Sequence, residues 1–248
     1  MAKRRSLTAL LVTIMIQFTN PSADLFISDD SEPSTALERT THLGVGAHQD
    51  DLEVMALHGI LACYKQPQQW FGGVTVTNGA GSSRTNEYAD YTDEQMQVVR
   101  AEEQRKAAVV AEYAFMTQLD YPSSAVKEAG NGDYAADLRT ILAAARPQVI
   151  YTHNLADKHD THVAVVVPLI RALRELPEDV RPAKIYGVEV WRDLNWLLDS
   201  EKVLLELNDR PNLVRALISI FDSQISAGKR YDLPLEGRLG GTPTFYDS

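Results

Sequence analysis

Short runs of almost wholly apolar residues alternate along this chain with longer stretches of helical pattern. Strands that are apolar throughout are buried on both faces, and strands that alternate with helices form parallel sheets covered by helices on both sides. The sequence therefore predicts an α/β fold with a three-layer arrangement. The predicted strands are 42–47, 70–77, 148–153 and 184–191, and the predicted helices are 51–64, 93–115, 133–145 and 162–175.

The first 35 residues differ from the rest of the chain. Residues 3–5 are basic and residues 7–18 are mostly apolar, which is the outline of a secretory signal but too short for a membrane span of about 20 residues. The apolar residues also recur at helical spacing, which favours a packed helix. We expect residues 1–35 to form an N-terminal helix or signal-like segment followed by a link at 20–33, and residues 36–248 to form a single domain. The helix interpretation predicts a cytoplasmic protein, and export through the signal is the alternative.

Composition excludes several classes of function. The chain has 24 Lys and Arg against 34 Asp and Glu, a net charge of −10, which argues against nucleic acid and anionic membranes as partners. Its one cysteine, Cys63, excludes a disulfide within the chain and a cysteine-rich zinc site. Any metal must therefore be bound by His, Asp or Glu. The Gly- and Pro-rich residues 237–248 are expected to form a surface arm.

The side chains best suited to chemistry follow two of the predicted strands. His48, Asp50 and Asp51 come directly after the first strand, and His162 follows the third. The carboxyl ends of parallel strands meet at one edge of a sheet. A catalytic zinc ion takes three protein ligands and keeps one position for water. We therefore expect His48, Asp51 and His162 to converge on one metal ion, with Asp50 beside them as a base toward the metal-bound water.

Each half of this pattern has a structural alternative. Asp50 or Asp51 is placed to cap the helix that follows, and the pair His159 and His162 is compatible with a solvated helix start. His153, at the end of the third strand, either contacts a substrate or is a buried structural histidine. The occurrence of both halves after two strands of one parallel sheet favours the metal site.

Three segments resemble the signatures of the PIG-L/LmbE-like zinc de-N-acetylases. Residues 46–53 (GAHQDDLE) are similar to the family's Ala-His-Pro-Asp-Asp-Glu motif. Residues 156–165 (ADKHDTHVAV) resemble the second signature, in which two histidines lie three residues apart. Arg100-x-x-Glu103 is similar to a third recurrent pattern. Order and spacing agree over about residues 40–190.

The resemblance implies roles for individual residues. It implies a Rossmann-like three-layer sandwich with a mostly parallel sheet, and zinc bound by His48, Asp51 and His162. It also implies that Asp50 is the general base and that His159 stabilises the oxyanion. The implied function is that of a metal-dependent hydrolase that removes an N-acetyl group from a small-molecule amino sugar or amino-sugar conjugate. Zn²⁺ is the implied cofactor, and iron is the alternative because His and Asp sites discriminate poorly between these metals.

The chain departs from the family's pattern at three places. Gln49 replaces the usual proline. An Asp-Thr pair replaces the usual Pro-Asp pair before the last histidine, and our hypothesis is that Asp157 or Asp160 supplies the missing carboxylate behind His159. Asp222 replaces a histidine near the C-terminus, so substrate contacts are not expected to follow the family's there.

Two other functions remain open. One is an amidase that cleaves a larger acyl or thiol conjugate, and the other is a non-catalytic ligand-binding α/β domain. A dinucleotide site is disfavoured because no G-x-G-x-x-G fingerprint follows the first strand. The loop 82–92 is expected to be either a substrate lid or a plain surface loop. Self-association into a homo-oligomer is compatible with an acidic α/β hydrolase of this size.

Overall fold

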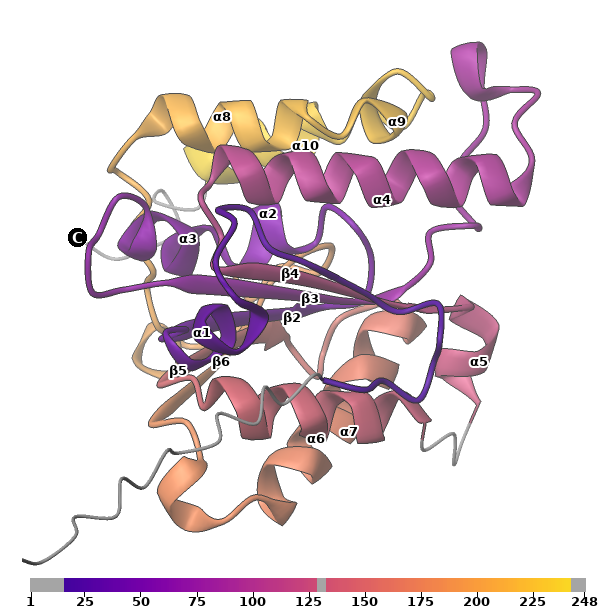
Figure 1. The fold of residues 1–248 in the computed structure, drawn as a ribbon. Helices are drawn as coiled ribbons and strands as arrows, with labels where there is room; N and C mark the ends of the chain where they lie inside the picture. Colours follow the sequence, from indigo (N-terminus) through magenta and orange to yellow (C-terminus); the bar gives the residue numbers. More distant parts are fainter. Residues whose placement is uncertain (1–15, 129–132, 242–248) are drawn as a thin grey trace, which may run out of the picture.

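A six-stranded, mostly parallel sheet forms the centre of the molecule (Figure 1). The structure is a computed structural model that describes residues 16–128 and 133–241. The strands are β1 (Asp24–Phe26), β2 (His42–Gly46), β3 (Phe71–Thr77), β4 (Phe115–Tyr121), β5 (Val149–His153) and β6 (Lys184–Val188). They lie in the order β1-β4-β3-β2-β5-β6, and neighbouring strands are parallel except β1 and β4. The predicted α/β class is confirmed.

Helices cover both faces of the sheet (Figure 1). They are α1 (Pro33–Glu38), α2 (Leu52–Met55), α3 (Leu57–Cys63), α4 (Asp93–Val110), α5 (Ser123–Lys127), α6 (Asp133–Ala145), α7 (Asp160–Glu175), α8 (Pro211–Ser219), α9 (Asp222–Ile225) and α10 (Asp232–Gly241). On one face α2, α3, α4 and α8 pack together, and on the other α1, α6 and α7 do so. The sheet is thus the middle layer of three.

Each face of the sheet has its own apolar core, which explains why the strands are apolar throughout. In β5, Ile150 enters the core beneath α6 and α7, whereas its neighbour Tyr151 enters the core beneath α3 and α8. Leu169 of α7 and Leu217 of α8 are fully buried in these two cores. Burying a side chain of this size contributes about 1.5–3 kcal/mol. Both layers of helices are therefore held by comparable apolar contacts.

Strand β4 was not predicted: the helix expected over 93–115 ran into its first residue, and residues 116–121 were assigned to no element. The helix ends at Val110, and Glu112 then adopts a φ of 55°, which a continuous right-handed helix does not allow. β4 contains Thr117 and Gln118, whose polar side chains are buried in the sheet. Gln118 and Asp120 interrupt the run of apolar and threonine residues that marks β3.

The ends of the chain differ from expectation as well. The stretch 20–33, expected as a link, contains β1, which pairs with β4 from Asp24 opposite Gln118 to Phe26 opposite Met116. A strand of three residues is too short to show a hydrophobic period. The expected arm at 237–248 begins inside α10, which ends at Gly241. Most of the helix or signal predicted over residues 7–18, and the rest of the arm, lie outside the described residues.

The predicted helix 51–64 is divided into α2 and α3. Ala56, between them, has φ −102° and ψ 12°, so the helical hydrogen bonding is interrupted there. Helix α7 begins at Asp160, two residues before the predicted start. These differences leave the position of the candidate site unchanged, because both loops still follow the carboxyl ends of β2 and β5.

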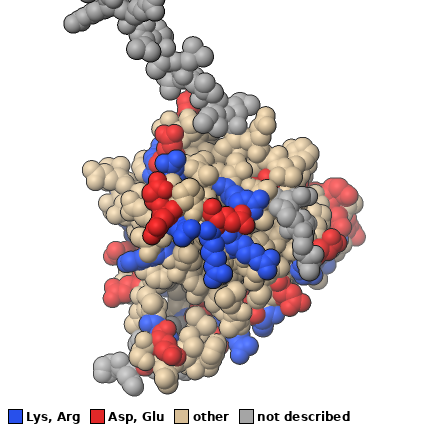
Figure 2. All heavy atoms as spheres, turned by 90° about the horizontal axis from the view of Figure 1, so that it is seen from below, with Lys and Arg blue, Asp and Glu red and all other residues tan. Residues whose placement is uncertain are grey.

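The surface beneath α6 and α7 carries intermingled charges (Figure 2). Arg139 of α6 and Glu175 of α7 form an ion pair of 3.3 Å on this side. In the described part of the chain, no helix combines the length and the apolar character that a membrane crossing requires.

Candidate active site

The candidate site lies where β2 and β5 end side by side. These strands are hydrogen-bonded in parallel, with Val45 opposite Thr152. The chain then turns into α2 through His48 and Asp51, and into α7 through His159 and His162. Parallel pairing thus brings together two loops that are more than a hundred residues apart in sequence, as the sequence predicted.

His48, Asp51 and His162 converge in the structure. Oδ2 of Asp51 lies 3.3 Å from Nδ1 of His48, and Oδ1 lies 3.5 Å from Nε2 of His162. One potential ligand atom from each residue falls within 4.8 Å of the others. Ligand atoms around a tetrahedral zinc ion with bonds of about 2.0–2.1 Å lie roughly 3.3 Å apart. The donor set and its spacing therefore fit zinc.

His162 is oriented for a metal by its second ring nitrogen. Nδ1 lies 3.0 Å from Oδ2 of Asp157, which is a carboxylate–histidine arrangement that fixes the tautomer of a metal-binding imidazole. Nε2 is buried and has no hydrogen-bond partner within residues 16–128 and 133–241. A buried ring nitrogen without a partner costs free energy unless a ligand meets it.

Asp51 makes no capping bond to α2, although it occupies the N-cap position. Its carboxylate accepts a 2.6 Å hydrogen bond from the backbone N–H of His48. Burial by itself would raise the pKa of Asp51, but the facing His162 and His153 lower it well below its usual value. The carboxylate is thus held ionised, the form that binds a cation.

A second group of potential ligands overlaps the first. His153, Asp157 and His162 also place one ligand atom each within 4.8 Å. All three are buried, whereas the side chain of His48 in the first group is 23% exposed. In addition, Nε2 of His153 accepts a 2.9 Å hydrogen bond from the N–H of Ala47, so it is engaged in the fold. The first group is therefore the better candidate for a metal open to substrate.

Asp50, the predicted base, lies beside these residues in an unusual backbone conformation. Its φ is 88°, a positive value that residues other than glycine rarely adopt. Oδ1 accepts a 2.9 Å hydrogen bond from Nη2 of Arg100. Burial raises the pKa of Asp50 to about 6, against the opposing charge of Arg100. The buried side chain of Arg100, from helix α4, thus holds the Asp50 carboxylate in place.

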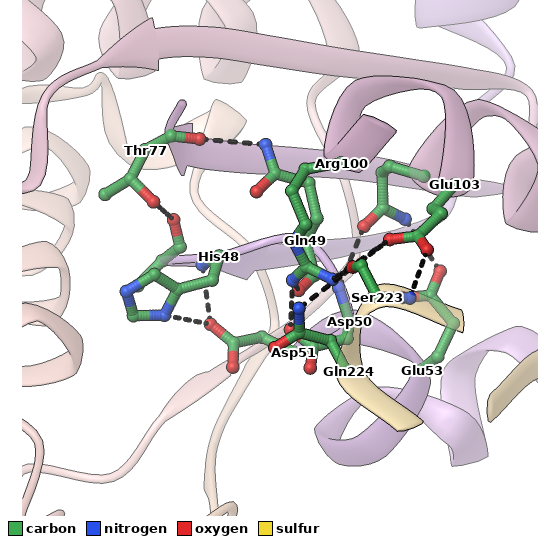
Figure 3. A network of polar contacts seen from close by, with 12 residues as sticks. His48, Gln49, Asp50, Asp51, Glu53, Thr77, Arg100, Glu103, Ser223 and Gln224 are labelled. Carbon is green, nitrogen blue, oxygen red and sulfur yellow. Dashed lines mark hydrogen bonds and ion pairs between the residues drawn. The ribbon is translucent and has the colours of Figure 1, made fainter. Parts of the chain in front are cut away.

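The pattern Arg100-x-x-Glu103 ties the C-terminal part of the chain to Asp50 (Figure 3). Arg100 also donates to the carbonyl of Gln49 and, over 3.2 Å each, to Glu103 and Ser223. Glu103 accepts from both the backbone N–H and the hydroxyl of Ser223 at 2.7 Å. The sequence pointed to this pattern by resemblance, but gave it no role. It forms the buried network that positions Asp50.

Gln49, where the family has proline, makes contacts of its own (Figure 3). Its Nε2 donates to the carbonyl of Thr77 at 3.0 Å and to Oε1 of Gln118 at 3.2 Å. These bonds tie the turn after β2 to the end of β3 and to the middle of β4. The substituted residue therefore fastens the turn that carries Asp50 and Asp51.

The carboxylate expected behind His159 is placed elsewhere. Asp157 accepts from the backbone N–H of His159 at 3.0 Å, while its other oxygen faces the ring of His162. The ring of His159 stacks on that of His162 with centroids 4.5 Å apart. Partial burial, together with the charges of His162 and His48, lowers the pKa of His159 to about 4. The hypothesis was therefore wrong for Asp157, whose free oxygen faces the ring of His162 and not that of His159.

The loop 82–92 contacts the segment around Asp222. Tyr88 donates a 2.6 Å hydrogen bond to the exposed Asp222, and Asn86 donates to the carbonyl of Ser226 at 2.7 Å. Lys229 instead faces inward and donates to Gln224 at 3.1 Å, and its charge lies close enough to act on Asp50. The charge of Lys229 thus acts on the proposed base, whereas Asp222 is exposed and bound to Tyr88.

A family model described as GlcNAc-PI de-N-acetylase (PIG-L) matches residues 43–173. This stretch contains all the proposed ligands, the proposed base and His159. The model therefore supports a deacetylase. No curated protein matches the chain in sequence at a significant level.

Several solved structures share the fold. The N,N'-diacetylchitobiose deacetylase of Pyrococcus horikoshii is 15% identical at a TM-score of 0.63, over 83% of this chain and 79% of that one. An A40926 pseudoaglycone deacetylase is 18% identical at a TM-score of 0.54, over 82% and 93%. A 4-carboxy-2-hydroxymuconate hydratase of Pseudomonas putida is 18% identical at a TM-score of 0.61, over 83% and 88%. Because a hydratase shares the fold with deacetylases, the fold alone does not determine the reaction.

Proposed function

This chain belongs to the PIG-L family of de-N-acetylases, and we propose that it is a metal-dependent N-deacetylase that acts on an amino sugar or an amino-sugar conjugate. The observation that carries this proposal is the convergence of His48, Asp51 and His162 beside the buried Asp50. Family membership supports hydrolysis of an amide, and the donor set supports zinc.

The proposed metal ligands are His48, Asp51 and His162. Zinc bound there would act as a Lewis acid for the amide carbonyl and make water a stronger acid. Asp157 keeps His162 in the tautomer whose Nε2 faces the other ligands. The backbone N–H of His48 keeps the Asp51 carboxylate turned toward the same point. The second group of potential ligands, His153, Asp157 and His162, shares His162 with the proposed site.

The proposed base is Asp50, positioned by Arg100. Its carboxylate accepts a proton from the attacking water, whose oxygen forms a bond to the amide carbon, and later gives that proton to the leaving nitrogen. The C–N bond breaks, and the products are acetate and a free amine. Arg100 leaves one carboxylate oxygen available, because its contact is to Oδ1. Transfer by a positioned group of this kind typically contributes 10²–10⁴-fold in rate.

His159 is proposed to donate a hydrogen bond to the developing oxyanion. Its side chain is exposed on the open side of the site, against the rings of His48 and His162. A neutral imidazole can donate from one nitrogen. Losing a donor of this kind costs about 10²–10³-fold in turnover.

The test combines metal content with product formation. We expect about one zinc per chain and acetate release from N-acetylglucosamine derivatives for the wild type. His162→Ala is expected to lose both, Asp50→Asn to keep the metal and lose hydrolysis, and the control His42→Ala, outside the site, to keep both. A folded, zinc-supplemented wild type that binds no metal would contradict the proposal and favour a non-catalytic binding domain.

A further inference from the structure

A second side chain of helix α4, that of Gln104, contacts the turn that carries Asp50. Gln104 follows Arg100 by four residues, so the two side chains lie on the same face of the helix. Gln104 is fully buried, and its Oε1 accepts a 3.2 Å hydrogen bond from the backbone N–H of Asp50. Neither the proposed metal ligands nor the contacts of Arg100 with Glu103 and Ser223 account for this bond.

Gln104 and Arg100 hold the two ends of one peptide unit. The peptide between Gln49 and Asp50 presents its carbonyl oxygen to the guanidinium of Arg100 and its N–H to the side chain of Gln104. A peptide unit is planar and rigid, so bonds at both ends fix its rotation and, with it, the φ of Asp50. A φ of 88° costs free energy in a residue other than glycine and persists only where the surrounding structure enforces it. The two side chains of α4 provide that enforcement.

Glu53 determines which way the amide of Gln104 points. Nε2 of Gln104 donates a 2.8 Å hydrogen bond to Oε1 of Glu53, a residue of α2 that is fully buried. The same oxygen accepts a 2.7 Å hydrogen bond from the hydroxyl of Tyr113. An amide donates from its nitrogen and accepts on its oxygen. With the nitrogen at Glu53, the oxygen of Gln104 is left facing the N–H of Asp50.

The orientation of this peptide matters because Asp50 lies between two proposed metal ligands in sequence, His48 and Asp51. Rotation of the peptide would change the direction of the Asp50 side chain and move its carboxylate relative to the ligands. A misplacement of about 1 Å caused away from the reacting atoms can cost about 10²-fold in rate. A bond to the backbone N–H of Asp50 can therefore affect hydrolysis without any contact with the substrate.

We propose that Gln104, oriented by Glu53, is a positioning residue for the proposed base. Together with Arg100 it holds the peptide between Gln49 and Asp50, so that the Asp50 carboxylate stays beside the proposed metal site. This inference rests on the proposed function, in which Asp50 is the base. Gln104 acts through the backbone of Asp50, so its loss lowers kcat and leaves KM and metal content unchanged.

The variant Gln104→Leu tests the proposal, because leucine fills the buried position but cannot accept a hydrogen bond from Asp50. The measurements are zinc content and release of the free amine from N-acetylglucosamine derivatives. We expect kcat to fall about 10–100-fold, KM to stay within about twofold of the wild-type value, and about one zinc per chain to remain bound. An unchanged kcat, with hydrolysis by the wild type intact, would overturn the positioning role and leave the proposed function standing.

Tyr113→Phe is the matched control in the same buried network. It removes one hydrogen bond to Oε1 of Glu53 but leaves the bond from Gln104 to that oxygen in place. We therefore expect its kcat to stay close to that of the wild type. An equal loss of kcat in Tyr113→Phe and Gln104→Leu would overturn the proposal, since a weakened core would then explain both.

A pair of substitutions at Glu53 separates hydrogen bonding from packing. Glu53→Gln keeps an oxygen that can accept from Gln104, whereas Glu53→Leu has none, so we expect Glu53→Gln to retain more of the wild-type kcat. Equal kcat values in the two variants would overturn the role of Glu53. If Gln104→Leu does not fold, Gln104→Asn replaces it, because its amide is one methylene too short to reach Asp50. The same loss of kcat is expected, and wild-type kcat in Gln104→Asn would overturn the proposal.

If the wild type hydrolyses no amide, the proposed function fails, and the positioning role is tested on the backbone alone. Crystal structures of the wild type and of Gln104→Leu then give the φ of Asp50. We expect the positive φ in the wild type and its loss in the variant, because one end of the peptide is released. A positive φ that persists in Gln104→Leu would overturn the proposal.

Discussion

At the scale of single residues, the site depends on carboxylates that orient histidines. Asp157 and Asp160 lie five and two residues before His162 in sequence, and the sequence alone did not distinguish them. Only the path of the loop before α7 brings Asp157 to 3.0 Å from Nδ1 of His162. The choice depends on backbone conformation, which residue types and spacing do not specify.

This assignment gives a prediction for metal affinity. Asp157→Asn keeps the size of the side chain but removes the charge that fixes the tautomer of His162, so we expect zinc to bind about 10–100-fold more weakly. The measurement is competition with a chelator of known affinity. Asp160→Asn is the matched control, and equal weakening by the two substitutions would show that Asp157 has no special role.

The ligand positions themselves were accessible from the sequence. His48, Asp50 and Asp51 follow directly on β2, and the end of a buried strand is a position that the apolar pattern fixes within a residue or two. The role of Arg100 was not accessible, because it depends on α4 crossing above the turn after β2 (Figure 1). Nothing in the local sequence shows which turn a helix will cross.

At the scale of elements, helix α4 carries the support of Asp50. The helix begins with a capping box: Thr92 accepts from the N–H of Gln95 at 3.2 Å, and the Gln95 side chain accepts from the N–H of Thr92 at 2.8 Å. Such caps satisfy backbone groups that a helix leaves unpaired at its start. The first turn therefore fixes where the helix begins, two turns before Arg100.

We expect Thr92→Ala to lower the free energy of unfolding by about 1 kcal/mol, the usual cost of losing a side-chain cap. Thr92→Ser retains the hydroxyl and is expected to remain close to the wild type. Urea unfolding monitored by circular dichroism measures both. Equal stability of all three proteins would show that the cap contributes nothing to the helix.

The elements that sequence reasoning missed share one property. β1 has three residues, and β4 includes Gln118 and Asp120, so neither shows the run of apolar and threonine residues that marks β3. Their pairing is determined by the sheet as a whole, since β4 lies between β3 and β1. Local pattern identifies strands at the centre of the sheet better than those toward its antiparallel edge.

At the scale of the whole molecule, metal binding should be visible as stability. A ligand that binds only the folded state stabilises that state by about 2.7 kcal/mol when its free concentration is about a hundred times its dissociation constant. For a chain of this size that corresponds to a rise in Tm of roughly 5–11 °C. We expect this rise when zinc is added to the metal-free wild type and not when it is added to His162→Ala. An equal rise in both would place the bound zinc elsewhere.

The C-terminal third was the least predictable part of the molecule. Residues 189–210 form little regular structure, and α9 has four residues, so neither periodicity nor length indicates how they pack. Yet this part supplies Ser223 to the network around Arg100 and Glu103. The sequence located the proposed ligands and base, and the fold was needed to show what packs around them.

The link from Arg100 and Glu103 to Ser223 limits how the chain can be shortened. A fragment ending at Leu173 would retain every proposed ligand and the base. It would nevertheless leave the Glu103 carboxylate without its two donors from Ser223, and would remove the Leu217 and Phe221 side chains that cover one face of the sheet. The region that matches the family model is therefore not a minimal catalytic unit, and the autonomous unit extends at least through α9.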